Sequence, residues 1–189
     1  MNRRPQIQLS PQEQAAFFRE QRKAALATLD QHGFPHVVAM NYFAKDGAFY
    51  MTSYGKAQKV VNIRRNPKVA LMIEKGDAYA ELRGVMVRGN CEIIEGADAV
   101  RAAFAGMAEA RGAGPSRPSG SVDSAPKRVV LKIVPEKVTS WDHSKLGGRY
   151  LPPARQSALS RSWAARRRSA SPVALCGSHS LRGSMPSRR

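Results

Sequence analysis

Short stretches rich in β-branched and aromatic residues recur along this chain, separated by residues that favour turns. Apolar runs bounded by Gly, Pro, Asn and Asp are typical of β-strands joined by tight turns. The first two runs are expected to form a hairpin around Gly33. Gly84 and Gly89 predict either a bend in one long strand or a strand pair. The predicted strands cover residues 25–30, 36–43, 48–53, 68–74, 78–94 and 128–134.

Three other segments have the periodic apolar spacing of helices. The first begins at a capping box, in which Ser10 and Glu13 bind each other's backbone amides. The second is short and basic, and it ends before Pro67. The predicted helices cover residues 11–22, 56–65 and 97–111. Short antiparallel strands with few helices are typical of a mainly β fold that closes into a β-barrel, which leaves no strand edge exposed.

Length and composition predict one folded domain with appendages. A chain of 189 residues is long enough for one hydrophobic core but short for two domains of ordinary size. After residue 150 the chain is mainly Arg, Ser, Ala and Pro, so little apolar burial would offset the entropy lost on ordering. We therefore expect an N-terminal helix in 1–23, a β-barrel domain in 24–148 and a disordered basic tail in 149–189.

Positive charge is present in both the domain and the tail. The formal net charge is +17, and eight of the 31 Lys and Arg residues follow residue 150, where Asp and Glu are absent. The first 150 residues keep a charge of about +9, which favours an anionic ligand. Three interpretations of the tail stay open: a flexible extension, a nucleic-acid-binding arm, and a frameshift or read-through product.

Several protein classes do not fit the sequence. The chain has neither an apolar run of the roughly 20 residues that span a bilayer nor the pattern of a signal peptide, so we expect a cytoplasmic protein. Cys91 and Cys176 lie far apart without clustered His, so we expect no metal site or disulfide framework, and a buried strand position for Cys91. Motifs of dinucleotide-binding, P-loop and α/β-hydrolase folds are absent.

Residues 50–67 combine features of a phosphate-binding site. A predicted strand ends in the hydroxyl residues Thr52 and Ser53, and a glycine then lets the backbone turn into a short helix. Free amides and the dipole at a helix start attract phosphate, and Lys56 and Lys59 add positive charge there. The alternative is an ordinary solvated face of basic residues.

The order of short motifs resembles that of the pyridoxamine 5'-phosphate oxidase-like superfamily. The matching residues lie within 20–148 and are Gly33-x-Pro35-His36-Val37-Val38, Tyr50-x-Thr52-Ser53, Lys59, Asn62, Arg65-Asn66-Pro67-x-Val69, Arg128 to Val134, and Val138-Thr139-Ser140-Trp141-Asp142-His143. This resemblance implies a split β-barrel of the FMN-binding type. It also implies a homodimer with two cofactor sites at the subunit interface, and makes 24–148 the cofactor-binding domain.

Cofactor contacts follow from the resemblance residue by residue. It places the phosphate-binding lysine at Lys59 and hydroxyl groups that face the cofactor at Thr52 and Ser53. Asn62 matches a polar phosphate contact of deazaflavin-type members, and Lys56 is a looser match.

Two departures bear on the activity. Classical vitamin B6 oxidases have an Arg where Gln58 stands, and another on the second strand, where this chain has Val37 and Val38. These departures argue against that activity and favour reductases that use FMN or the deazaflavin coenzyme F-420. The residues leave both cofactors open.

The resemblance implies an oxidoreductase that moves a hydride to or from a small organic substrate. The cofactor supplies this chemistry, so the chain needs no catalytic residue of its own. His36 is a candidate proton donor or a structural histidine. Trp141 and His143 are candidates for capping the pocket from the other subunit or for packing the barrel end. Candidates for a substrate opening, or else surface strand positions, are Tyr79, Arg83 and Arg88.

Two other functional classes stay open. One is a non-catalytic flavin- or haem-binding protein that stores or senses its ligand. The other is a basic nucleic-acid-binding protein, although we expect neither nucleic-acid nor membrane binding from the folded domain itself.

Overall fold

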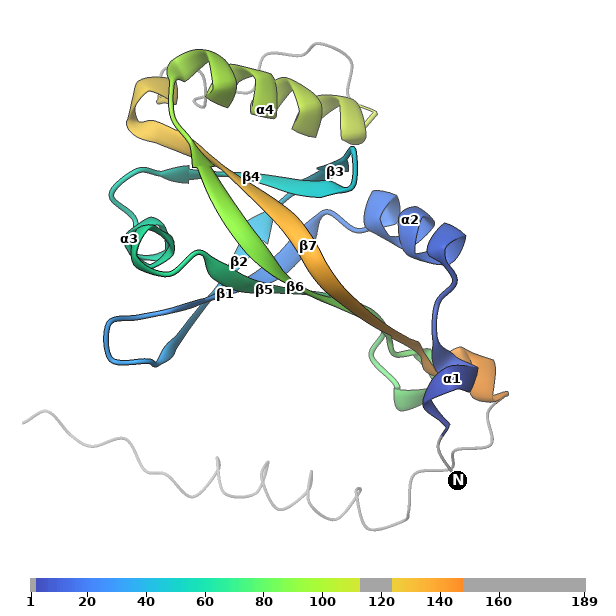
Figure 1. Ribbon diagram of the computed structural model, residues 1–189. Helices are drawn as coiled ribbons and strands as arrows, with labels where there is room; N and C mark the ends of the chain where they lie inside the picture. Colours follow the sequence, from blue (N-terminus) through green and yellow to red (C-terminus); the bar gives the residue numbers. More distant parts are fainter. Residues whose placement is uncertain (1–2, 113–123, 148–189) are drawn as a thin grey trace, which may run out of the picture. The chain divides into compact units, whose positions relative to one another are not determined.

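A computed structural model describes residues 3–112 and 124–147, which form one curled antiparallel sheet with short helices (Figure 1). The seven strands lie in the order β2-β1-β5-β6-β7-β4-β3. They are β1 Lys23–Leu29, β2 Pro35–Asn41, β3 Phe43–Lys45, β4 Ala48–Tyr54, β5 Lys68–Lys75, β6 Arg83–Ile94 and β7 Arg128–Asp142. The helices are α1 Arg4–Ile7, α2 Pro11–Glu20, α3 Gln58–Arg65 and α4 Ala97–Ala110, with 3-10 turns η1 Tyr79–Glu81, η2 Ala125–Lys127 and η3 His143–Leu146. The predicted mainly β, split-barrel fold class is confirmed.

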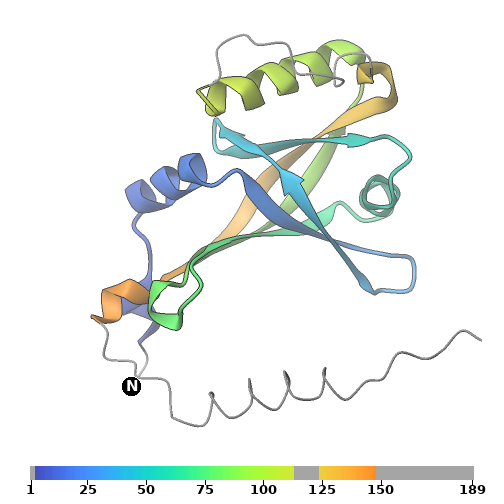
Figure 2. The same cartoon turned by 180° about the vertical axis from the view of Figure 1, so that it is seen from behind.

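The hairpin of β1 and β2 forms as the sequence predicts. Leu26 lies opposite Val38, and the connecting turn contains Gly33 in the left-handed region at φ 85°. The carboxylate of Asp30 accepts hydrogen bonds from the backbone amides of His32 at 2.8 Å and Phe34 at 2.9 Å. The long hairpin is visible from behind in Figure 2.

The prediction of one strand over 36–43 is wrong in its last residues. The strand β2 ends at Asn41, and Phe43 begins β3 at the opposite edge of the sheet. Phe43 lies opposite Tyr50 of β4, and it packs in the smaller core under α4, whereas Tyr42 packs in the main core. The Tyr42 hydroxyl also donates to the Phe18 carbonyl at 3.1 Å, so the chain leaves the strand here. The first four strands therefore form two hairpins, which lie at the two ends of the sheet.

A long pair of strands, β6 and β7, forms the centre of the sheet. The predicted segment 78–94 divides into the turn η1 and the strand β6, and β7 extends beyond the predicted 128–134. A register shift between Arg88 and Gly89 lets β7 continue through Pro135. A Cβ at Gly89 would lie 2.1 Å from the Val134 carbonyl oxygen, so only glycine fits this bulge.

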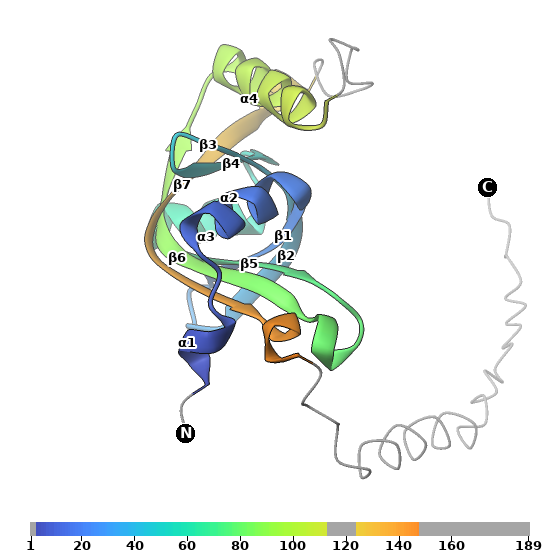
Figure 3. The ribbon, with the colours of Figure 1, turned by 90° about the vertical axis from the view of Figure 1, so that its right-hand side faces the viewer.

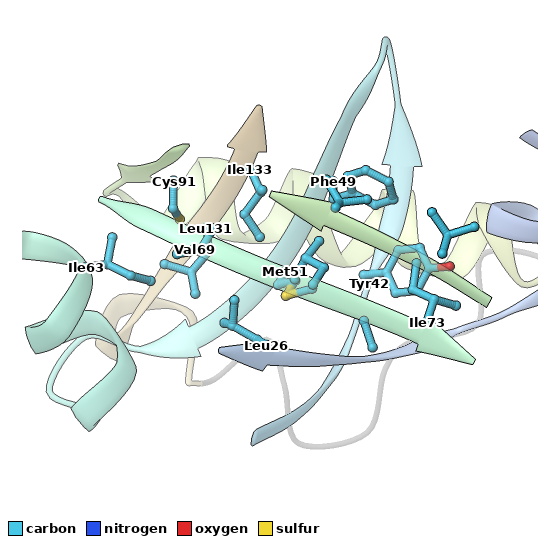
Figure 4. Close-up of a cluster of buried hydrophobic side chains, with 14 of the residues drawn as sticks. Leu26, Tyr42, Phe49, Met51, Ile63, Val69, Ile73, Cys91, Leu131 and Ile133 are labelled. Atoms are coloured by element: carbon cyan, nitrogen blue, oxygen red, sulfur yellow. The ribbon is translucent and has the colours of Figure 1, made fainter. Parts of the chain in front are cut away.

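The main hydrophobic core fills the inside of the curled sheet. Leu26, Met51 and Leu131 point into it from three strands and are fully buried (Figure 4). Val60 and Ile63 of α3 close one end of the core, and Phe17 of α2 is buried against it.

The helix α4 packs on the outer surface of β4 and β7, where Figure 3 shows it apart from β1 and β2. A second, smaller core lies under it, and its buried residues are Phe43, Val100, Ala103, Met107, Ala125 and Val130. In the described part of the chain, no helix is long and apolar enough to cross a bilayer.

Candidate cofactor-binding site

The loop between β4 and α3 leaves the first turn of a helix open to a ligand. The residue that precedes α3, Ala57, has an extended backbone and a side chain that cannot cap the helix. The first backbone amides of a helix have no partner within the helix itself. The Val60 amide donates to the Ala57 carbonyl at 2.8 Å, and no side-chain oxygen caps this end, so the amides before Val60 and the helix dipole are available to an anion.

Lys56 and Lys59 stand at this open helix end. Lys56 is exposed, whereas Lys59 is half-buried. Burial first, and then the positive charge of Arg128, lower the pKa of the Lys59 ammonium below its ordinary value. An anion bound here would relieve the charge repulsion.

The start of β7 brings two further cations to the same place (Figure 1). The backbone amide of Gly55 donates to the Lys127 carbonyl at 3.0 Å, and Arg128 lies opposite Tyr54 in the β4–β7 register. We call Lys56, Lys59, Lys127 and Arg128 the basic cluster. Within residues 3–112 and 124–147, none of the four forms an ion pair. Arg128 is not among the predicted cofactor contacts, because only strand pairing brings it to the loop.

Thr52 and Ser53 point to opposite faces of β4. Thr52 is half-buried, lies opposite Val130 and shares the outer face of the strand with Tyr54 and Arg128. Ser53 is 3% exposed and faces the barrel interior, where its hydroxyl donates to the Tyr54 carbonyl at 3.4 Å. The two predicted hydroxyl contacts therefore do not lie on one surface.

The Asn62 side chain takes part in a buried hydrogen-bond network. Its amide nitrogen donates to the Thr28 hydroxyl at 3.0 Å, and its oxygen accepts from the Gln58 side chain at 2.8 Å. Asn62 is fully buried. In this structure its side chain attaches α3 to β1, and its role as a phosphate contact stays a prediction.

His36 lies close to this network, at the beginning of β2. The Thr28 hydroxyl donates to its backbone carbonyl at 3.4 Å. Its Nδ1 atom is buried, and within the described residues it has no hydrogen-bond partner. A buried polar atom without a partner fits a site that a bound group completes. Together with the unpaired cations, it makes the barrel end around α3 suitable for a phosphorylated cofactor.

Four further candidates lie at the far end of β6 and β7, namely Trp141, His143, Tyr79 and Arg83. Trp141 packs against Gly84, so closely that a Cβ there would lie 2.3 Å from its ring. The rings of His143 and Tyr79 are 4.3 Å apart. Arg83 lies 3.6 Å from the Asp142 carboxylate. Within one chain, these contacts hold the end of the sheet together and lie away from the basic cluster, so capping of the pocket by Trp141 and His143 from another subunit stays a prediction.

Cys91 is buried in β6, as predicted, and burial raises the pKa of its thiol to about 12. Such a thiol is no nucleophile at neutral pH. In the part of the chain that the structure describes, no group of His, Cys, Asp and Glu side chains is placed to hold a metal ion.

Comparisons with known proteins agree with this fold. A conserved hypothetical protein from Mycobacterium tuberculosis is 36% identical, with a TM-score of 0.71 over 80% of this chain and 96% of that one. An F420 reductase is 24% identical, with a TM-score of 0.54 over 66% and 94% of the two chains. The heme storage protein HutZ from Vibrio cholerae is 17% identical, with a TM-score of 0.55 over 69% and 94%. The likenesses to the F420 reductase and to HutZ, which are below 25% identity, show the fold alone.

Among curated proteins, no match was found. The model of the family described as pyridoxamine 5'-phosphate oxidase matches residues 10–142, which include the whole sheet and the basic cluster. The chain therefore belongs to the pyridoxamine 5'-phosphate oxidase family.

Proposed function

We propose that the protein is an oxidoreductase that uses a bound flavin-type cofactor, FMN or coenzyme F-420, for hydride transfer to or from a small organic substrate. The observation that carries this proposal is the open start of α3, at which Lys56 and Lys59 have no ion-pair partner among the described residues. Membership of the family supports it, since this family includes oxidoreductases.

The residues of the chain have binding and positioning roles in this proposal. The Lys59 ammonium and the first amides of α3 hold the phosphate, and the Thr52 hydroxyl offers a further donor on the outer face of β4. When bound, the cofactor supplies the hydride chemistry, while the protein sets its position and excludes water. No residue is assigned to proton transfer.

The test is to purify the full chain from its native host and to identify what copurifies. An oxidised-flavin spectrum and the mass of FMN select FMN, and absorption at shorter wavelength with the deazaflavin mass selects coenzyme F-420. The reduced cofactor is then mixed with candidate acceptors and its reoxidation followed. A protein that binds neither cofactor on titration would contradict the proposal.

Storage or sensing is the alternative within the same fold. It differs from the proposed function in turnover, since a storage protein binds its ligand and releases it unchanged. The fold likeness to a heme storage protein does not extend to haem binding by this chain, because identity is only 17%. Tight binding of a flavin that no reductant or acceptor cycles would favour storage.

We also propose that the functional form is a homodimer. The observation that favours it is an apolar face on the outside of β2, β1, β5 and β6. This face consists of two cross-strand rows, one of Val37, Ala27 and Ala70, which ends at Arg88 on β6, and one of Ala25, Met72 and Met86. Val37 is 57% exposed and Met72 is 43% exposed in the single chain. Contiguous apolar patches of this kind mark interaction surfaces.

A further inference from the structure

In the described part of the chain, the neighbours that hold the guanidinium of Arg128 carry no negative charge. It lies over the Tyr54 ring, 4.2 Å from the centroid, and 5.7 Å from the centroid of Phe104. Its Nε donates to the Ser124 hydroxyl at 3.0 Å. Aromatic rings and a hydroxyl orient an arginine but supply no negative charge.

A purely structural arginine in this setting would be expected to pair with a carboxylate. Within residues 3–112 and 124–147, Arg128 forms no ion pair, and the Glu95 carboxylate is paired with Arg64 at 2.8 Å. Arg128 instead lies near Lys59. Besides burial, its positive charge lowers the pKa of the Lys59 ammonium, and this repulsion is unfavourable to both cations. Two cations that no described acid neutralises form a site for an oxyanion with two negative charges.

We propose that Arg128 is a second phosphate-binding residue, which together with Lys59 selects a phosphate monoester such as the terminal phosphate of FMN. This inference rests on the proposed function and deepens it. A monoester phosphate is close to doubly charged at neutral pH, whereas a diester carries a single charge. The planar fork of a guanidinium binds two phosphate oxygens at once, which the point charge of a lysine does not do.

The position of Arg128 suits this role. It shares the outer face of the sheet with Thr52, two residues before Tyr54 on β4. The first turn of α3 follows this strand after the short loop 55–57. The guanidinium, the threonine hydroxyl and the helix amides thus come from three elements that meet at Gly55.

The experiment compares Arg128→Gln with the full-length wild type by titration of FMN and of riboflavin, which lacks the phosphate. The dissociation constant for FMN should rise about ten- to a hundredfold, as for the loss of one charge-assisted contact, while that for riboflavin should stay within about twofold. Arg128→Lys keeps the charge and should lose less than Arg128→Gln. Arg101→Gln is the charge-matched control, because Arg101 is paired with Asp98 on α4.

Inorganic phosphate and dimethyl phosphate test the anion site without a flavin. At matched ionic strength, phosphate should raise the melting temperature of the wild type more than dimethyl phosphate does, and Arg128→Gln should abolish this difference. If FMN binds Arg128→Gln as tightly as the wild type, or if riboflavin affinity falls equally, the inference is overturned and the proposed function stands. If neither flavin-type cofactor binds the wild type but the phosphate effect is present, the anion site stands and the proposed function fails.

Discussion

At the scale of single residues, the sharpest prediction concerns Lys59. Lys59→Ala should raise the dissociation constant for FMN or coenzyme F-420 about ten- to a hundredfold, because it removes a charge-assisted contact to phosphate. Without cofactor, the free energy of unfolding should be unchanged or slightly higher, since Lys59 is partly desolvated and lies near the positive charge of Arg128. Fluorescence titration and thermal melts measure the two effects.

The matched control is Lys68→Ala, which removes the same charge from an exposed position at the start of β5. This variant should bind the cofactor as the wild type does. Equal small losses for both variants would mean that the phosphate site is misplaced.

Asn62 tests whether a matching motif residue binds the cofactor or supports the fold. Asn62→Ala should lower the free energy of unfolding by about 1–3 kcal/mol, because it removes the amide that donates to the buried Thr28 hydroxyl and the oxygen that accepts from the Gln58 side chain. A structural role predicts this loss in the absence of cofactor. A large fall in cofactor affinity with unchanged stability would instead support the phosphate contact.

These residues show how far the site can be predicted from sequence. Lys59 and the open helix start follow from local spacing, since strand, glycine and helix are consecutive. The burial of Asn62 does not, because it depends on the packing of α3 against β1. Arg128 reaches the candidate site only through its pairing with Tyr54. Neither segment alone predicts which distant strand it pairs with.

At the scale of elements, the three predicted helices and the first hairpin form where the sequence predicts them, although only α2 has a side-chain cap. The capping box at Ser10 is present, with the Glu13 carboxylate accepting from the Ser10 amide at 2.7 Å. The sequence does not predict the transfer of the chain from β2 to β3, because 36–43 has uniform strand propensity and the break is visible only in the pairing of Phe43 with Tyr50 of β4. The sequence does not predict the extension of β7, because Pro135 has no backbone N–H to donate and is compatible with a central strand only at a bulge.

The helix α2 supplies a prediction about acid stability. Glu13 accepts hydrogen bonds from Lys145 at 2.7 Å and from the Ser10 amide, and these contacts lower its pKa to about 2. Because this pKa lies below the value of 4.5 for a free carboxyl, the ionised form stabilises the fold above pH 4.5, and this contribution is lost as the pH falls toward 2. Melting temperatures between pH 2 and 6 should therefore fall less steeply in Glu13→Gln than in the wild type. Glu109→Gln, an exposed change on α4, should leave the slope unaltered.

At the scale of the whole molecule, the chain after Tyr150 should be dispensable for fold and cofactor binding. These residues lie outside the described part of the chain, and their composition gives no core-forming pattern. A protein truncated after Tyr150 should keep the melting temperature and the FMN affinity of the full chain. A large fall in either would show that the domain boundary at 148 is wrong. Binding to nucleic acid that is steeply salt-dependent and vanishes on truncation would support the basic-arm interpretation.

Assembly is the last property to test, and the apolar face defined by Val37, Met72 and their neighbours makes a specific prediction. The wild type should be a dimer in light scattering at low micromolar concentration, because a stable interface of about 1,600 Å² in total would cover this face. Met72→Glu places a charge among apolar side chains on β5, so it should give a monomer, since burying an unpaired charge is costly. Ala105→Glu, an exposed change on α4, should remain dimeric.

The resemblance places the cofactor at the subunit interface, so Met72→Glu should also weaken FMN binding while the fold, followed by circular dichroism, is kept. A wild type that scatters as a monomer would contradict the dimer, whereas a monomeric Met72→Glu that binds FMN normally would show that one chain completes the site.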